Sequence, residues 1–253
     1  MCQLKRKKDI VSFVSAQERV RINDIAEHFG ISTMTVRRDL YELEKQGLLS
    51  VNRGVAIIST GTGVELSSSL RADRMYKEKA RIGKAAAAYV TDGSTVFLDC
   101  GTTVKELAFE LTGKKNITVI SNSLLVINTL CACENIRLIA APGTFHHTAM
   151  NFLDVTTFTY LSKVFVDVCF FGADAVMPNI GVAVPNISDC EIKKLLCSRS
   201  KQRVVLADSS KVGREAMYTF ADFEQLNVLV TDTHCAKEAA EQMRALGTSV
   251  LMV

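Results

Sequence analysis

Seven short apolar runs beyond residue 94 constrain the fold of this chain more than any other feature of its sequence. Each run has the length and the β-branched content of a buried strand, and stretches of helical character separate most of them. Strands that alternate with helices predict a mainly parallel sheet with helices on both faces. The predicted strands are Thr95–Leu98, Ile117–Ile120, Ile136–Ala140, Val164–Phe171, Val204–Leu206, Val228–Val230 and Val250–Val253, and the predicted helices lie near residues 103–112, 123–132, 149–161, 188–200 and 235–246.

The first of these strands leads into Asp99-Cys100-Gly101-Thr102-Thr103, where a helix is predicted to begin. In sheets of this kind, ligands bind beyond the carboxyl ends of the strands. Small residues there let backbone amides approach a ligand, and a helix N-terminus attracts an anion. The stretch is therefore a candidate phosphate site, although Gly and Thr at such a turn are equally typical of a simple helix cap. It matches neither the P-loop nor the dinucleotide-binding pattern.

The ends of the second, fourth and fifth predicted strands are also polar and small. They read Ser121-Asn122-Ser123, Gly172-Ala173-Asp174 and Asp208-Ser209-Ser210-Lys211. Polar groups that converge on one edge of a sheet, with a lysine among them, suit an anionic ligand that carries several hydroxyl groups. A sugar phosphate fits this description, and we expect neither a cofactor nor a metal ion.

The N-terminal part of the chain carries a different pattern, in which two short amphipathic helices meet at Gly30. The first covers residues 22–29. The second begins after Ser32, whose hydroxyl can accept a hydrogen bond from the free amides of the first turn. Val36 and Leu40 lie on one stripe of this second helix. Two short helices joined by a glycine turn predict a helix-turn-helix, and an ordinary pair of surface helices is the alternative.

The outer face of the second helix is the predicted DNA-contacting surface. A further helix near residues 5–16, and two strands within residues 48–59 that turn at Asn52-Arg53-Gly54, would complete a winged helix-turn-helix. On the second helix, Arg37 lies toward the flank and suits a phosphate contact. The predicted DNA-contacting residues are Ser32, Thr33, Met34, Thr35, Arg37, Arg38, Tyr41 and, at the tip of the wing, Arg53.

These patterns divide the chain into two domains. Residues 1–58 form the predicted DNA-binding domain, residues 59–70 are a linker rich in Ser, Thr and Gly, and residues 71–253 form an α/β ligand-sensing and oligomerisation domain that begins with a helix over 71–90. Ten basic and seven acidic residues lie within residues 1–58, whereas the remainder holds twenty of each. All the excess positive charge therefore lies in the domain expected to meet the phosphate backbone.

Composition narrows the class of protein further. No apolar stretch is long enough to span a bilayer, and the basic run Lys5-Arg6-Lys7-Lys8 is not followed by the apolar core of a signal peptide. The eight cysteines are scattered and lack the spacing of a disulfide framework or a zinc centre. We therefore expect a cytoplasmic protein that does not interact with membranes.

The stretch from Arg21 to Ala56 resembles the N-terminal domain of the DeoR family of bacterial transcriptional repressors. That family carries a Ser-x-x-Thr-[Val/Ile]-Arg-Arg-Asp-Leu stretch followed by Leu-Glu-x-x-Gly. Its wing usually reads Arg-x-His-Gly-Gly-Ala, whereas this chain has Ser50-Val51-Asn52-Arg53-Gly54-Val55-Ala56. The matching residues are Ser32, Thr35, Val36, Arg37, Arg38, Asp39, Leu40, Leu43, Glu44 and Gly47.

The rest of the chain is similar to the sensor domain of the same family, through stretches in the family's order around residues 97–103, 121–124, 166–172, 206–211 and 230–232. The resemblance implies a fold like those of ribose-phosphate isomerase and coenzyme A transferases. It also implies a double-stranded DNA operator as partner, and release of that operator by a phosphorylated sugar or sugar derivative. The ligand residues that it implies are Asp99, Gly101, Thr102, Thr103, Asn122, Ser123, Gly172 and Lys211, to which Asp174 at the fourth strand end is added.

Three alternatives remain open. Where the family tends to have Gly-Gly after the third strand, this chain has Pro142-Gly143, followed by an unusual loop to Phe152, so the effector is expected to differ or to have been lost. A sugar-phosphate isomerase of the related fold would carry an acid immediately before Gly172-Ala173-Asp174. That position is Phe171, which cannot accept a proton, so we expect no enzyme activity. A ligand-free oligomerisation domain is the third alternative. For the chain read as a regulator, a homo-oligomer, a dimer or a tetramer, is expected.

Overall fold

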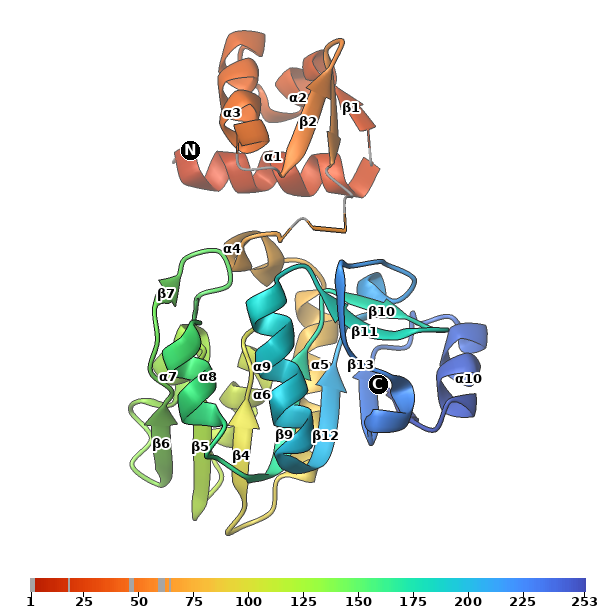
Figure 1. Cartoon of the computed structure of the whole chain (residues 1–253). Helices are drawn as coiled ribbons and strands as arrows, with labels where there is room; N and C mark the ends of the chain where they lie inside the picture. Colours follow the sequence, from red (N-terminus) through yellow and green to blue (C-terminus); the bar gives the residue numbers. More distant parts are fainter. Residues whose placement is uncertain (1–2, 18, 46–47, 59–61, 64) are drawn as a thin grey trace. The chain divides into compact units, whose positions relative to one another are not determined.

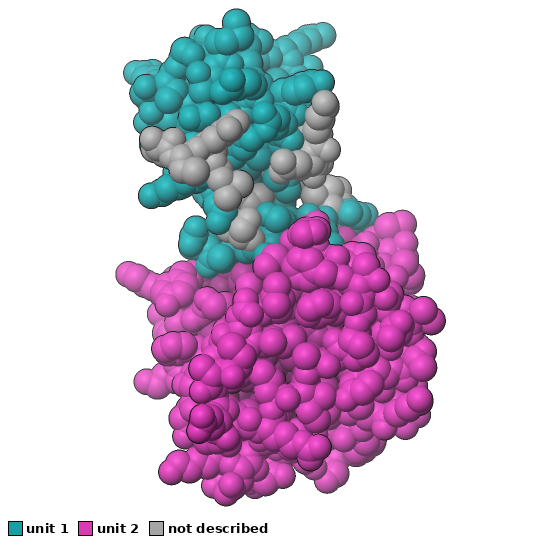
Figure 2. All heavy atoms as spheres, turned by 90° about the vertical axis from the view of Figure 1, so that its left-hand side faces the viewer, with its two compact units in different colours: residues 1–74 teal, residues 75–253 magenta. Residues whose placement is uncertain are grey.

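The computed structural model of the protein describes residues 3–17, 19–45, 48–58, 62–63 and 65–253. The chain divides into two compact units, Met1–Arg74 and Met75–Val253, which Figure 2 colours separately. Each unit has a hydrophobic core of its own. They are described one at a time below.

The first unit is a winged helix-turn-helix, as predicted. Its three strands form an antiparallel sheet in the order β1-β3-β2, and its core is built from apolar side chains such as Ile10, Ile25 and Leu40. Gly30 ends α2 in the left-handed conformation, which glycine adopts without strain. The elements are α1 (Gln3–Gln17), β1 (Arg19–Arg21), α2 (Ile22–Phe29), α3 (Thr33–Lys45), β2 (Leu49–Asn52) and β3 (Val55–Ile58).

The segment that joins the units differs from the prediction. Residues 59–61 and 64 of the predicted linker, and Gly47 of the family motif, lie outside the described residues. The end of the predicted linker belongs to a short helix, α4 (Ser68–Ala72), which packs against α1. The continuous helix predicted over 71–90 is wrong. Met75 adopts a left-handed conformation with φ of 52°, which separates α4 from α5 (Tyr76–Ala86) and the 3-10 turn η1 (Ala87–Tyr89).

The second unit is built on a seven-stranded sheet in which all neighbouring strands are parallel, in the order β15-β14-β12-β9-β4-β5-β6 (Figure 1). Each of the seven apolar runs in the sequence forms one of these strands, so the predicted α/β class is confirmed. The strands are β4 (Thr95–Leu98), β5 (Ile117–Ser121), β6 (Ile136–Ala140), β9 (Val166–Gly172), β12 (Ser200–Leu206), β14 (Val228–Thr231) and β15 (Ser249–Met252).

Helices cover both faces of this sheet, and Figure 1 shows α9 in front of the strands with α5 and α6 behind them. Because side chains alternate along a strand, neighbouring residues enter different cores. Phe170 of β9 belongs to the core beneath α5 and α6, whereas Phe171 belongs to the core beneath α8 and α9. The covering helices are α6 (Thr102–Leu111), α7 (Leu124–Leu130), α8 (Val155–Leu161), α9 (Ile187–Ser198) and α10 (Lys237–Ala245).

Two small antiparallel sheets were not predicted. The first contains β10 (Ala175–Met177), β11 (Gly181–Val184) and β13 (Tyr218–Ala221), and the second is the hairpin of β7 (Phe145–His146) and β8 (Asn151–Phe152). The hairpin replaces the first part of the helix predicted over 149–161.

That helix, α8, begins only at Val155, because Asp154 caps it. The Asp154 carboxylate accepts hydrogen bonds from the amides of Thr156 and Thr157, and the Thr157 hydroxyl in turn accepts one from the Asp154 amide. This reciprocal capping box ends the hairpin and starts the helix.

Candidate functional site

The helix α3, whose outer face is the predicted DNA-contacting surface, begins as the sequence predicts. The Ser32 hydroxyl accepts a hydrogen bond from the Thr35 amide at 3.2 Å and lies 2.9 Å from the Thr35 hydroxyl. Val36 and Leu40 are buried in the core, whereas Met34 on the opposite face is 75% exposed. Tyr41 of the same helix is also exposed, at 57%, so α3 presents two large exposed side chains with apolar surface.

The predicted DNA-contacting residues gather on this helix and on the wing. Thr35 is half-buried, and its hydroxyl lies 2.9 Å from that of Ser32. Arg53 lies at the tip of the β2–β3 hairpin, where Arg53 and Gly54 have φ of 48° and 79° and form a tight turn that matches the twist of the strands. The predicted residues that are exposed are Ser32, Thr33, Met34, Arg37, Arg38, Tyr41 and Arg53.

Asp39 holds the first unit together instead of facing DNA. Its fully buried carboxylate accepts hydrogen bonds from Arg6 Nε at 2.6 Å and Arg6 Nη2 at 3.2 Å. Next along the basic run, Lys7 pairs with Glu42 of the same helix. The basic run at the start of α1 therefore anchors α3. The signal in the sequence was the position of Asp39 between the buried residues Val36 and Leu40.

The polar strand ends of the second unit meet at one edge of the sheet. The strands β12, β9, β4 and β5 are consecutive neighbours, and Leu98 pairs with Ser121 in the last register of β4 and β5. Asp99 and Asn122 are the next residues on the two strands, so they lie side by side just beyond the sheet. The Ser121 hydroxyl donates to the Leu98 carbonyl at 2.6 Å and secures this end of the pairing.

The carboxylate of Asp99 is buried and pairs with a lysine that the sequence analysis did not identify. Lys193 Nζ of α9 donates to Asp99 Oδ2, which also accepts the Gly172 amide at 2.9 Å. Asp189, one turn earlier on α9, lies 3.4 Å from the same ammonium. Burial alone would lower the pKa of Lys193, but the carboxylates of Asp189 and Asp99 outweigh it and raise that pKa. The i, i+4 spacing of Asp189 and Lys193 was the available signal.

The Lys193 ammonium lies next to a cluster of side chains that could bind a metal ion. Oxygen atoms of Asp99 and Asp189 and the sulfur of Cys100 lie within 4.8 Å of one another, an arrangement that could hold an ion. Lys193 already supplies a positive charge between the two carboxylates. In the structure, the cation that the two carboxylates hold is therefore the Lys193 ammonium.

Two glycines bring backbone close to this site. Gly101 precedes α6 with φ of 136°, a conformation that L side chains rarely adopt, and Thr102 and Thr103 begin the helix. A Cβ added to Gly172 would lie 2.7 Å from the Cys100 carbonyl oxygen. Glycine is thus required at 172 by the close approach of β9 to the turn after β4.

The remaining predicted ligand residues separate into two groups. Ser123 caps α7, because its hydroxyl accepts the Val126 amide at 3.4 Å. On the other side of Asp99, Lys211 Nζ lies 3.9 Å from Asp174 Oδ1, and both side chains are largely buried. The structure therefore places Asp99, Asn122 and Ser123 along β4 and β5, and it places Asp174 and Lys211 beyond β9 and β12.

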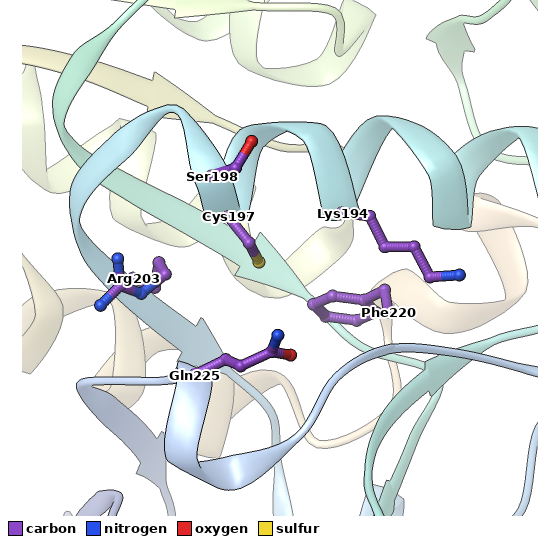
Figure 3. Close-up of a pocket in the computed structure, with 6 residues that line it drawn as sticks. All are labelled: Lys194, Cys197, Ser198, Arg203, Phe220 and Gln225. Atoms are coloured by element: carbon purple, nitrogen blue, oxygen red, sulfur yellow. The ribbon is translucent and has the colours of Figure 1, made fainter.

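A pocket that the sequence did not predict opens elsewhere in the second unit, beside the last turn of α9 (Figure 3). Its volume is about 270 Å³, and burial raises the pKa of the Cys197 thiol in its wall to about 12. It contains none of the predicted ligand residues. Its lining residues are Lys194, Cys197, Ser198, Arg203, Phe220 and Gln225.

A winged helix-turn-helix joined to an α/β unit with polar strand ends defines the class of DNA-binding transcriptional regulators that carry a sensor domain. Comparison with known families gives the same class. Residues 6–62 match the DeoR-like helix-turn-helix domain, and residues 74–233 match the DeoR C-terminal sensor domain. The chain belongs to the DeoR family of transcriptional regulators.

Similar curated proteins extend over nearly the whole chain. The lactose phosphotransferase system repressor of Staphylococcus epidermidis strain RP62A is 31% identical over 92% of this chain and 94% of its own length. The putative aga operon transcriptional repressor of Escherichia coli O157:H7 is 28% identical, with 98% and 93% covered. The glycerol-3-phosphate regulon repressor of Escherichia coli K12 is 28% identical, with 92% of each covered.

Among solved structures, ribose 5-phosphate isomerase A of Methanocaldococcus jannaschii is similar over 55% of each chain, with a TM-score of 0.41 and 22% identity. Within the described residues, no helix has both the length and the apolar character needed to cross a membrane.

Proposed function

We propose that this protein is a repressor of carbohydrate-metabolism genes, and that a phosphorylated sugar bound at the strand ends of the second unit releases it from its DNA operator. The observation that carries the proposal is the edge formed by β12, β9, β4 and β5. Four neighbouring strands there end in hydroxyl, amide, carboxylate and ammonium groups. Such a set of groups suits a ligand that carries both an anionic group and hydroxyl groups.

The turn into α6 supports phosphate binding at this edge. Gly101 contributes no side chain to cap the helix, and the buried residues Thr102 and Thr103 begin it. The first amides of a helix of this length attract an anion through their free N–H groups and the helix dipole. Lys211, in the 3-10 turn (Ser209–Lys211) that follows β12, supplies a positive charge near the same edge.

The relatives support a response to sugars. Their names refer to a lactose phosphotransferase system, to the aga operon and to the glycerol-3-phosphate regulon, and each is called a repressor. We infer that this chain responds to an effector of the same broad class. Its unusual loop from Pro142 to Phe152 distinguishes it from the usual family pattern, so the individual effector is expected to differ.

An isomerase activity is the alternative function, and the site argues against it. The residue before Gly172-Ala173-Asp174 is Phe171, which is fully buried and packs 5.5 Å from the ring of Phe220. A ring in that position cannot take a proton from a sugar carbon. The nearby Asp99 carboxylate is already bound by Lys193 and the Gly172 amide.

We infer that the protein acts as a homo-oligomer, a dimer or a tetramer. Recognition by a helix-turn-helix commonly uses two copies of the recognition helix on half-sites separated by one or more turns of DNA. Effector binding would change how the copies are arranged and so weaken binding to both half-sites together. By the same coupling, the protein bound to DNA would bind the effector more weakly than the free protein does.

A thermal-shift screen with sugar phosphates, followed by an isomerase assay on every compound that binds, tests the proposal. A ligand that binds only the folded state raises the melting temperature. We expect at least one sugar phosphate to raise it and none to be converted. Turnover of a bound compound would support the isomerase instead. If the rise in melting temperature survives in both Thr102→Val and Lys211→Ala, the ligand binds elsewhere.

A further inference from the structure

The unusual loop after β6 reaches the proposed effector site through Asn151 of β8. Ser123 and Asn151 form an isolated antiparallel bridge, and the Phe152 amide donates to the Asn122 carbonyl at 2.8 Å. Asn151 Nδ2 lies 3.4 Å from Cys100 Sγ, in the turn between β4 and α6. Asn151 is fully buried. The hairpin therefore places this side chain between the ends of β4 and β5.

Three residues at this edge each carry a buried acceptor oxygen: Asp99 Oδ1, Asn122 Oδ1 and Asn151 Oδ1. Within the described part of the chain, none of the three has a hydrogen-bond partner. The orientation of Asn122 is fixed, because its Nδ2 atom donates to the Phe152 carbonyl at 3.1 Å. Its oxygen must therefore be the atom that lacks a partner.

Buried oxygens of this kind are costly, since each has given up its hydrogen bonds to water. Native proteins tolerate few of them, and a ligand is one reason to keep them. All three atoms accept hydrogen bonds and none can donate, so the group that satisfies them must carry several donors. The hydroxyl groups of a sugar are such donors, whereas a phosphate that is fully ionised accepts only.

We propose that Asn151, with Asp99 and Asn122, binds the hydroxyl groups of the effector and so determines which sugar the protein recognises. This inference rests on the proposed function and divides the effector between two subsites. The phosphate lies at the N-terminus of α6, and the polyhydroxylated part lies against the three oxygens. The hairpin β7–β8 thus serves as a specificity element, supplied by the part of the chain that departs from the usual family pattern.

The test measures dissociation constants of full-length protein by calorimetry. The probes are inorganic phosphate, glucose 6-phosphate, ribose 5-phosphate, fructose 6-phosphate and glucitol 6-phosphate, with 2-deoxyglucose 6-phosphate and 2-deoxyribose 5-phosphate as analogues that lack one hydroxyl. The variants are Asn151→Ala and the control Asn179→Ala, which changes an exposed asparagine between β10 and β11. Loss of one buried hydrogen bond to a ligand weakens binding by about tenfold or more.

We expect at least one sugar phosphate to bind the wild type and Asn179→Ala equally, and to bind Asn151→Ala at least about tenfold more weakly. For inorganic phosphate, or for a deoxy analogue that lacks the recognised hydroxyl, the two asparagine variants should bind alike. This second comparison separates loss of a contact from misfolding, because a misfolded variant would lose every ligand.

Two results would overturn the inference in distinguishable ways. If a sugar phosphate binds Asn151→Ala as tightly as it binds the wild type, the role of Asn151 is refuted while the proposed function stands. If no sugar phosphate in the panel binds the wild type, the proposed function fails, and the role of Asn151 fails with it.

Discussion

Lys193 and Asp99, 94 residues apart in the sequence, form a buried ion pair directly beneath the strand ends of the second unit. Their side chains are 2% and 1% exposed, respectively. The pair joins α9 to the end of β4, and the Gly172 amide adds β9 to the same carboxylate. It therefore fixes the geometry of the edge at which we place the effector.

Replacing Lys193 with Met is expected to lower the free energy of unfolding of the second unit by about 3–5 kcal/mol, because the substitution leaves two buried carboxylates without their cation. Urea unfolding measures this loss. Lys194→Met is the matched control, since Lys194 pairs with Glu191 on the exposed side of the same helix and should matter little. Equal losses in the two variants would contradict a structural role for the buried pair.

Much of this fold was predictable from the sequence, because the signals are local. The seven parallel strands are continuous apolar runs, and Ser32 and Gly30 mark the ends of the helices in the first unit. The contacts that complete the site are not local. The spacing of Asp189 and Lys193 indicates a pair within one helix, but nothing in the sequence showed that α9 carries Lys193 to Asp99.

The hairpin β7–β8 was missed for a related reason. Residues 149–161 have a composition compatible with a helix, but the extended segment β8 lies between Met150, which has a positive φ, and the capping box at Asp154. These are properties of backbone conformation that composition does not reveal. As a result, Asn151 was absent from the predicted ligand residues.

Replacing Asp39 with Ala should destabilise the first unit by about 1–3 kcal/mol, because the buried carboxylate holds Arg6 and so ties α1 to α3. DNA affinity should fall too, although Asp39 does not face the DNA. The melting temperature and operator binding measure the two effects. Asp24→Ala, which removes an exposed pair with Arg21, should change both less. A wild-type melting temperature for Asp39→Ala would refute the anchoring role.

Arg38 and Arg37 should differ in how they bind DNA. Arg38→Ala is expected to weaken operator binding by about 1–3 kcal/mol and to relax the preference at one base pair, because it removes a contact to a base edge. Arg37→Ala should weaken binding to all sequences alike. It should also reduce, by about one, the slope of the logarithm of the binding constant against the logarithm of the salt concentration. Selection from random duplexes, followed by titrations at several salt concentrations, distinguishes the two. Unchanged binding by Arg38→Ala would show that the outer face of α3 is not the reading surface.

The cap of α8 makes the hairpin sensitive to acid. The Thr144 hydroxyl, together with the Thr157 and Thr156 amides, lowers the pKa of Asp154 from 3.8 to about 2. A lowered pKa means that the folded state favours the carboxylate, so its stabilisation is present above about pH 4 and is lost as the pH falls toward 2. The stability difference between wild type and Asp154→Asn should therefore shrink over that range. Asp92→Asn, at an exposed turn, is the control. If its stability difference from the wild type shrank by the same amount over this pH range, the assignment to Asp154 would be contradicted.

The coupling of the two units is tested most directly by measuring operator affinity while a sugar phosphate is added. We predict that at least one compound of the panel raises the dissociation constant of the full-length protein for its operator by about fivefold or more. Thr102→Val and Lys211→Ala should bind the operator as the wild type does and lose this response. Operator affinity that no sugar phosphate changes, or variants that release DNA at the wild-type concentration, would contradict the proposed function.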